Sequence, residues 1–372
     1  MSYDFWNDDA FQAVALTKHI NVQPYVPTFF GEMNLFGDRI DGTTVEQRFT
    51  SSQQNGIYSD VASVTRENGR LMLLPTEARG SMPTYNQPDQ VIKRAFQVPY
   101  IPKNDEIFWD AIIGKRIYGQ STKESGLGGQ ETTAQAINRC LTKMWKEYLL
   151  TWEYHRLGAV KGVILDADGE QVVYDLYREF QIEGNGAGTG FGPKTIDYGA
   201  SLSQVSEQIV THVGDRLGAM MPGGIGCVVG KDFFEKVQDE VELNTAFERY
   251  KDGEHLRTSY QNEPYMSGAM NGFHYRGVTY YRYRGNLQTQ GANPVQTSMI
   301  DDDKGHTFVT GTDRYFRSNA PGTCEDAVAT MGLPIYVDRE PKKHKKGIDF
   351  HAESCPLFMN TQPEIGVTIN VL

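Results

Sequence analysis

The stretch "ETTAQAINRCLTKMWKEYLLTWEYHRLG", Glu131 to Gly158, carries the strongest helical pattern in the chain. Apolar residues recur at steps of three and four, the spacing of one helix face: Ala134, Ile137, Leu141, Met144, Tyr148 and Trp152, widened by Trp145 and Leu149. The pattern predicts one helix of about 27 residues, on the order of 40 Å long. We expect Gly158 to cap it, because glycine readily adopts the left-handed conformation.

The segment "VILDADGEQVVYD", Val163 to Asp175, follows this helix and is rich in acids. Asp166 and Asp168 fit the first two ligand positions of an EF-hand loop, but Gly169 comes too early for that motif and the flanks are strand-like. The same residues fit a tight hairpin turn that begins at Asp166 and has Gly169 in the left-handed position. We favour the turn over a cation loop or a pair of catalytic carboxylates.

The region from Thr43 to Tyr100 is polar and strand-like, with too few apolar residues for a core of its own. Asn68 and Gly69 lie between two strand-like runs, and Asn-Gly is the preferred two-residue hairpin turn. Isolated hairpins are marginal in water. We therefore expect this region to lie on the rest of its own chain or on a neighbouring molecule.

The second half mixes helices and strands without a regular strand-helix-strand rhythm. This pattern favours an α+β fold over a doubly wound parallel sheet. Helices are predicted at 201–218 and 231–242; β-rich segments at 159–165, 170–182, 224–230, 272–285, 305–311 and 366–372.

The net charge of -11 disfavours bulk binding of nucleic acid, which needs concentrated Lys and Arg. The four cysteines lie far apart, so we expect reduced, mostly buried thiols and neither a zinc cage nor a disulfide framework. The N-terminus lacks the pattern of a signal peptide, and no apolar run approaches the roughly 20 residues of a membrane helix. We expect a protein that is made in the cytoplasm and stays soluble or assembles there.

Motifs that would carry catalysis fail on spacing or context. The glycine-rich loop 183–195 lacks the Gly-Lys-Ser/Thr of a phosphate loop, and Gly224 and Gly226 precede a strand instead of following it. The histidines form no zinc motif, and we expect His155 to face the carboxyl end of the long helix as a dipole partner. We therefore predict no catalytic residue, no cofactor and no metal.

Two charged runs leave alternatives open. The basic run "REPKKHKKG", 339–347, is a solvated loop or an electrostatic contact with an acidic neighbour or with nucleic acid. The acids that begin at Asp301 are most simply a surface turn.

Four segments, in this order, resemble the major capsid proteins of lambda-type tailed phages, the capsid protein E family with the HK97-like fold. They are "NGRLMLLPTEARGSMP" (68–83), "EYHRLGAVKGVILDADGE" (153–170), "VVGKDFFEKVQDEVE" with "NTAFERYKDGE" (228–254) and "SCPLFMNTQPEIGVTINVL" (354–372). The resemblance covers nearly the whole chain, and the junction between helix and hairpin is its most specific part.

The resemblance implies an N-terminal arm (1–42), an extended β-hairpin loop (43–100), a peripheral domain with a spine helix and hairpin (101–200), an axial domain (201–334) and a return to the peripheral domain (335–372). It implies self-assembly into pentamers and hexamers of an icosahedral bacteriophage head in the virion. Decoration, scaffolding and portal proteins, and packaged double-stranded DNA without sequence-specific contact, are the implied partners. The alternatives are a soluble α+β enzyme acting on nucleotides or carbohydrates, and a non-viral shell compartment.

Overall fold

The computed structural model describes residues 12–23, 28–37, 47, 54–67, 91–112, 133–185, 190–199, 201–217, 222–239, 272–288 and 296–371. The chain divides into two compact units. Unit 1 comprises residues 1–62, 96–153 and 317–357, and unit 2 comprises 63–95, 154–316 and 358–372. Each unit is described by itself below.

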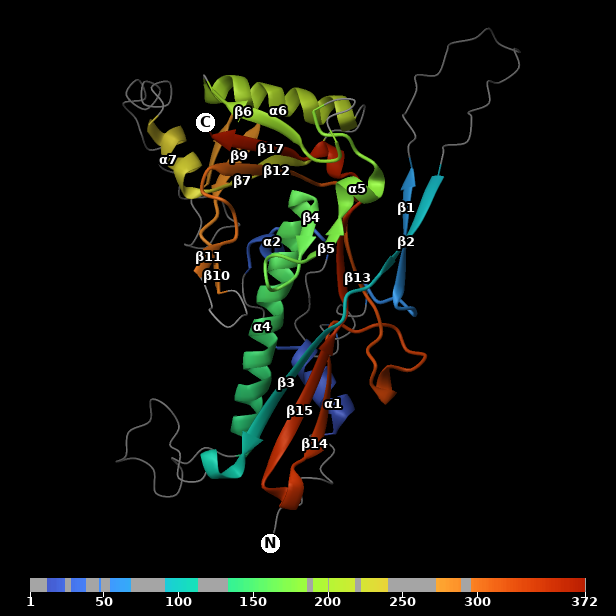
Figure 1. Cartoon of the computed structure of the whole chain (residues 1–372). Helices are drawn as coiled ribbons and strands as arrows, with labels where there is room; N and C mark the ends of the chain where they lie inside the picture. The colour runs from blue at the N-terminus through green and yellow to red at the C-terminus, as the bar shows by residue number, and fades with distance from the viewer. Residues whose placement is uncertain are drawn as a thin grey trace, which may run out of the picture. The chain divides into compact units, whose positions relative to one another are not determined.

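Unit 1 is built on a long helix and an antiparallel sheet. The sheet has three strands in the order β14-β15-β3 (Figure 1). Its elements are α1 (Ala13–Asn21), α2 (Phe29–Glu32), β3 (Ile101–Phe108), β14 (Tyr336–Pro341), β15 (Gly347–Ser354), the short 3-10 helices η3 (Trp109–Ala111), η5 (Glu325–Ala327) and η6 (Lys343–Lys345), and most of α4 (Thr133–Lys161).

Helix α4 packs its apolar face against this sheet. All the residues of the predicted face are buried except Ala134, which is exposed. The Tyr148 hydroxyl donates to the Ala352 carbonyl at 2.9 Å, and Trp152 Nε1 donates to Ser354 Oγ at 3.2 Å. Trp145 and Trp152 meet edge to face with ring centroids 5.6 Å apart. The predicted helix is confirmed, and polar contacts fix its register on the sheet.

Helix α1, which is part of the predicted N-terminal arm, packs within unit 1. Thr17 Oγ1 accepts from the Val337 amide at 3.0 Å, and Asn21 Nδ2 donates to the Ile335 carbonyl at 2.8 Å. Leu16 and Ile20, four residues apart on one face of α1, are buried. The amphipathic pattern of this short helix gives it a core position in its own chain.

Unit 2 is built on a mixed six-stranded sheet in the order β6-β17-β12-β7-β9-β8. The pairs β6-β17 and β7-β9 are parallel and the others that the register describes are antiparallel. The strands are β6 (Lys194–Tyr198), β7 (Gly224–Val229), β8 (Gly272–Tyr275), β9 (Val278–Arg282), β12 (Lys304–Thr310) and β17 (Val367–Val371). The mixed α+β class is confirmed.

The core of unit 2 lies between this sheet and two helices, α6 (Leu202–Leu217) and α7 (Lys231–Asp239). Figure 1 shows α6 running along the sheet. The apolar residues of α6 at four-residue steps, Val205, Ile209, Val213 and Leu217, are buried, and Phe233 of α7 stacks between Tyr198 and Tyr280. In these helices, apolar residues at helical spacing therefore mark the face that is buried against the sheet.

One expectation for unit 2 is wrong and another stays a prediction. The final strand β17 pairs with β12 and β6 in the six-stranded sheet, and the predicted return of 335–372 to the peripheral domain stays a prediction. Segment 170–182 is only partly strand: β5 (Val172–Asp175) gives way to helix α5 (Leu176–Phe180). The Asp175 carboxylate causes the change, because it accepts from the Tyr177 and Arg178 amides and so caps the helix.

The remaining strands form two-stranded pairs. They are β1 (Val61–Glu67) with β2 (Val91–Gln97), β4 (Val163–Leu165) with β5, β10 (Asn286–Gln288) with β11 (Gln296–Ser298), and β13 (Tyr315–Asn319) with β16 (Pro356–Asn360); η7 (Pro363–Ile365) is a short 3-10 helix. No described helix combines the length and apolar character needed to cross a membrane.

Candidate functional site

One face of β15 carries three ionisable residues at every second position, Asp349, His351 and Glu353. Successive side chains of a strand point to opposite faces of the sheet, so these three share a face while the residues between them are buried. The register places His351 between Asp338 of β14 and Asn104 of β3. A row of polar side chains therefore crosses the three strands.

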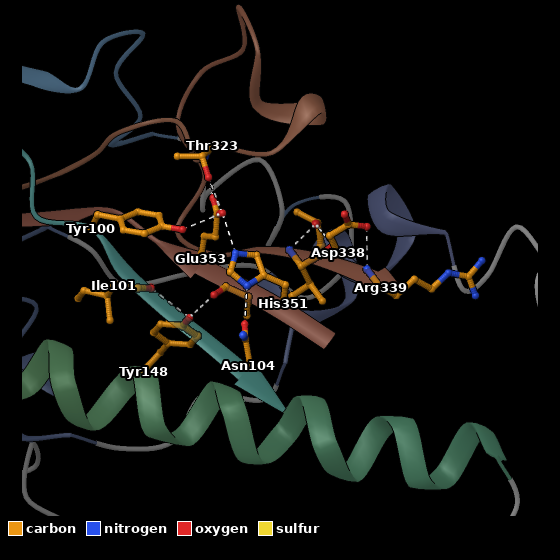
Figure 2. Close-up of polar contacts among 12 residues, drawn as sticks. Tyr100, Ile101, Asn104, Tyr148, Thr323, Asp338, Arg339, His351 and Glu353 are labelled. Atoms are coloured by element: carbon orange, nitrogen blue, oxygen red, sulfur yellow. Dashed lines mark hydrogen bonds and ion pairs between the residues drawn. The ribbon is translucent and has the colours of Figure 1, made fainter. Parts of the chain in front are cut away.

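Glu353 is the centre of a hydrogen-bonded cluster that Figure 2 shows in close-up. Its carboxylate accepts from the Tyr100 hydroxyl at 2.9 Å and from the Thr323 amide at 2.7 Å. The Thr323 hydroxyl and His351 Nε2, the latter at 2.8 Å, complete the contacts, and His351 Nδ1 lies against Asn104 Oδ1. We call these five residues the Glu353 cluster.

The electrostatics of this cluster favour a permanent carboxylate. Only 2% of Glu353 is exposed, and burial alone would raise its pKa. The hydrogen bonds from Thr323, His351 and Tyr100 outweigh burial and lower the pKa to about 2. A carboxylate with this pKa stays ionised at neutral pH and is a poor general acid or base.

The Glu353 cluster therefore acts as a structural clasp. Four donors occupy both carboxylate oxygens and come from three places in the chain: the residue before β3, the loop that contains Thr323, and β15 itself. Charge-assisted hydrogen bonds are stronger than neutral ones. The geometry fixes the loop to the sheet, with each oxygen of Glu353 accepting at least one hydrogen bond.

The acids after α4 form a turn that is exposed to solvent. The Gly169 amide donates to the Asp166 carbonyl at 3.0 Å, and Gly169 has a φ of 78°. Asp168 Oδ1 accepts from the Glu170 and Gln171 amides, both at 3.0 Å, and these hydrogen bonds lower the pKa of Asp168. The carboxylates of this turn hold backbone amides, which is the geometry of a hairpin turn.

The prediction that Gly158 caps the long helix is wrong. Helix α4 continues through Gly158 to Lys161, and Gly162 carries the positive φ, 84°, that ends it. Gly158 is instead a close-packing position, because a Cβ there would lie 3.0 Å from Cα of Ile164 and 3.1 Å from the Val163 carbonyl oxygen. The following hairpin folds back against the helix at this residue.

His155 does not act as a cationic partner of the helix dipole. It is 3% exposed, and burial lowers its pKa to about 4, so the imidazole is neutral at physiological pH. A neutral, buried ring interacts with the helix as a packing residue. Asp301 does lie in an exposed turn, where Lys304 Nζ approaches its carboxylate at 2.7 Å.

Several other predictions have partial outcomes. Asn68 and Gly69 lie outside the described residues, as does 186–189 of the glycine-rich loop. The basic run forms the turn between β14 and β15, in which Lys342 pairs with Asp349 at 2.6 Å and with Glu106.

All four cysteines are free thiols, and three of them are buried. Among the described residues, no group of His, Cys, Asp or Glu is arranged to hold a metal ion.

The sequence alone does not reveal the Glu353 cluster or a half-buried cation, Lys161. The alternation of apolar and ionisable residues in "IDFHAES", 348–354, was the available signal for the strand and its polar face. Nothing local predicts that Tyr100 and Thr323 meet Glu353, because these contacts join distant parts of the chain. Lys161, whose pKa burial lowers to about 8, donates to the Met299 carbonyl at 2.6 Å and likewise has no local signature.

Comparison with solved structures finds a phage-related protein and phage capsid structures, all at low sequence identity. A phage-related protein of Bordetella bronchiseptica RB50 is 8% identical with a TM-score of 0.47, and 95% of each chain is covered. The capsid structure of the cyanophage P-SCSP1u is also 8% identical with a TM-score of 0.46, over 86% of this chain and 85% of that one.

Sequence comparison gives the family. The major capsid protein of Salmonella phage Felix O1 is 26% identical over 305 residues, which cover 76% of this chain and 79% of the phage protein. Residues 12–371 match the family described as phage major capsid protein E. Because this match spans almost the whole sequence, the chain belongs to the phage major capsid protein E family.

Proposed function

We propose that copies of this chain assemble, through contacts with one another, into the icosahedral shell of a tailed-phage head that encloses double-stranded DNA. The observation that carries the proposal is the family match over residues 12–371. The family is one of structural capsid proteins, so the chain is a component of the virion and the enzyme alternative is set aside.

The two-stranded ribbon β1-β2 supports a role in contacts between subunits. It is a separate pair of strands that joins neither larger sheet. A two-stranded ribbon is marginally stable alone and needs a surface to lie on. Its own chain supplies part of that surface, since Val64 is buried and Arg94 pairs with Glu179 at 3.5 Å. We propose that this ribbon is the base of the extended loop, 43–100, and that a neighbouring subunit covers the face that remains exposed.

The division of the chain into two units supports the assignment of a peripheral and an axial domain. We propose that the long helix and three-stranded sheet of unit 1 form the peripheral domain, and that the six-stranded sheet with α6 and α7 forms most of the axial domain. The final strand β17 belongs with the axial sheet in this proposal. Pentamers and hexamers then arise from repeated contacts of one kind around closed axes.

The charge of the chain supports a container that does not hold its contents tightly. With a net charge of -11, the subunit repels phosphate on average, and we propose packaging without sequence-specific DNA contact. Decoration, scaffolding and portal proteins are proposed partners of the same shell.

Particle size tests this proposal directly. The purified full-length chain, alone or co-expressed with the other head proteins of its phage, is expected to sediment as megadalton particles. A chain that stays a folded monomer under all these conditions would contradict the proposed function.

A further inference from the structure

The outward face of α4 forms a basic groove. A groove of about 510 Å³ is lined by Arg139, Thr142, Lys143, Lys146, Glu147 and Leu150. Arg139, Lys143, Lys146 and Leu150 follow one another at steps of four, three and four residues, so they lie along one stripe of the helix. Leu150 is 48% exposed, which gives the groove an apolar end beside its cations.

The lining of the groove carries three cationic side chains, Arg139, Lys143 and Lys146, and one anionic side chain, Glu147. Glu147 pairs with Lys103 at 3.3 Å, and Lys143 pairs with Asp105 at 3.7 Å, both across to β3. The Lys143 side chain is 63% exposed despite this pair, and Lys146 and Arg139 are exposed too. The groove therefore presents a net positive surface with an apolar patch, which suits an acidic peptide with large apolar side chains.

The first eleven residues of this chain have that chemistry. The sequence "MSYDFWNDDAF" alternates aromatic and acidic residues and contains no Lys or Arg. Its acids are Asp4, Asp8 and Asp9, and its aromatic residues are Tyr3, Phe5, Trp6 and Phe11. Aromatic side chains in such number gain from burial against an apolar surface.

The attachment of the following residues brings this segment within reach. Thr142, a residue that lines the groove, donates from its hydroxyl to Gln23 Oε1 at 3.4 Å. From Gln23 the chain runs back through the nine residues of α1 to Gln12, a path of roughly 15–20 Å at about 1.5 Å per helical residue. Eleven extended residues span up to roughly 36–40 Å, so they can return to the groove of their own subunit.

We propose that residues 1–11 dock in the α4 groove of their own chain, with the acids beside Arg139, Lys143 and Lys146 and an aromatic residue against Leu150. Duplex DNA is the weaker candidate, since one cation is already paired with Asp105 and an apolar patch offers nothing to phosphate. Docking would hold residues 1–11 on unit 1 of their own subunit before that subunit assembles with others.

Zero-length cross-linking of the full-length chain with a carbodiimide tests the proposal. Peptides that join Lys143 or Lys146 to Asp4, Asp8 or Asp9 are expected by mass spectrometry. The Lys103–Glu147 pair, at 3.3 Å, is the internal positive control. If that control forms and no peptide links the N-terminal acids to either lysine, the proposal is overturned.

Two further arms identify the occupant. In a mixture of unlabelled and ¹⁵N-labelled chains combined before assembly, cross-linked peptides should be wholly light or wholly heavy, whereas mixed peptides would overturn docking within one chain. Lys146→Glu with Leu150→Ser should abolish the cross-link, and the matched Lys343→Glu with Lys345→Glu, in the exposed turn after β14, should not. Protection of Lys146 from acetylation only in DNA-filled heads, with no cross-link to residues 1–11, would assign the groove to DNA instead.

Discussion

At the scale of single residues, the ionisable groups that the fold buries are its most specific features. Glu353 accepts from the Thr323 amide, and the half-buried Lys161 donates to the Met299 carbonyl. Burial without a partner would be costly for either charge. Their partners make them stabilising elements of a structural protein.

Glu353→Gln should destabilise the isolated subunit by about 2 kcal/mol at neutral pH, because a neutral amide replaces charge-assisted hydrogen bonds. The folded pKa of Glu353, about 2, lies below its ordinary value of 4.5. The stabilisation is therefore fully present above pH 4.5 and is lost as pH falls toward 2. Urea unfolding at a series of pH values should show the difference between wild type and variant shrinking below pH 4.5.

The matched control for this prediction is Asp349→Asn, which removes a more exposed carboxylate from the same strand. It should cost much less stability, because exposed ion pairs contribute little. Equal losses from both variants, or a difference that does not change with pH, would show that the Glu353 cluster does not stabilise the fold through its charge.

Gly162→Ala should destabilise unit 2 by about 2 kcal/mol, because alanine is strained at a positive φ and its Cβ would meet the Tyr177 ring. Gly214→Ala is the control: a Cβ at this position of α6 meets nothing within 4 Å, and alanine should stabilise the helix by about 0.5–1 kcal/mol. Thermal unfolding of the two variants should shift in opposite directions. A neutral Gly162→Ala would contradict the assignment of the cap.

These glycines show how far sequence reasoning carries at a single residue. A glycine at the end of an apolar pattern predicts a cap, and both Gly158 and Gly162 satisfy that rule. The choice between them depends on the hairpin, whose Ile164 backbone approaches Gly158 and allows the helix to continue beside it. Tertiary packing, which the local sequence pattern does not contain, therefore determines which glycine ends the helix.

At the scale of elements, the hairpin β4-β5 owes its turn to backbone geometry. Asp168→Asn should leave shell assembly intact, since the asparagine Oδ1 can still accept from the Glu170 and Gln171 amides. Assembly yield measured by sedimentation is the readout. A loss of shells from this change alone would mean that the Asp168 charge itself takes part in a contact between subunits.

The proposed role of the extended loop in assembly can be tested separately. Replacement of residues 68–90 by a two-residue Asn-Gly turn keeps β1 and β2 but removes what lies between them. We expect circular dichroism to show both units still folded and electron microscopy to show no shells, because the contact with a neighbour is lost. Deletion of Ser52 to Pro83 should have the same effect on assembly, but it also removes the Asn319–Ile57 backbone bond within unit 1. Normal shells from the shorter replacement would refute the role of the loop.

Long helices with apolar residues at regular spacing were predictable, and short elements whose residues favour both helix and strand were not. Helices α4 and α6 have apolar residues at helical spacing over many turns, so both helices were predicted, and the face predicted for α4 is buried except at Ala134. Helix α5 has only five residues and a β-prone sequence, and it exists because Asp175 caps it. Short elements are decided by one or two contacts, which a pattern over many residues cannot detect.

At the scale of the whole molecule, the class and the family followed from the sequence, whereas the sheet order did not. The order of predicted helices and strands gave the α+β class, and four segments gave the resemblance that the family match confirms. The pairing of β6 with β17 joins residues 194–198 to 367–371. Such long-range pairings depend on the packing of the complete core, which no local pattern of the sequence contains.

The most direct test of the account is a cryo-electron microscopy reconstruction of particles formed by the full-length chain with its head partners. We expect closed icosahedral shells built from rings of five and six copies, with the six-stranded sheet of unit 2 nearest the ring axes and the β1-β2 ribbon lying on an adjacent subunit. Monomers or open aggregates under every condition would contradict the central claim that this chain builds a phage head.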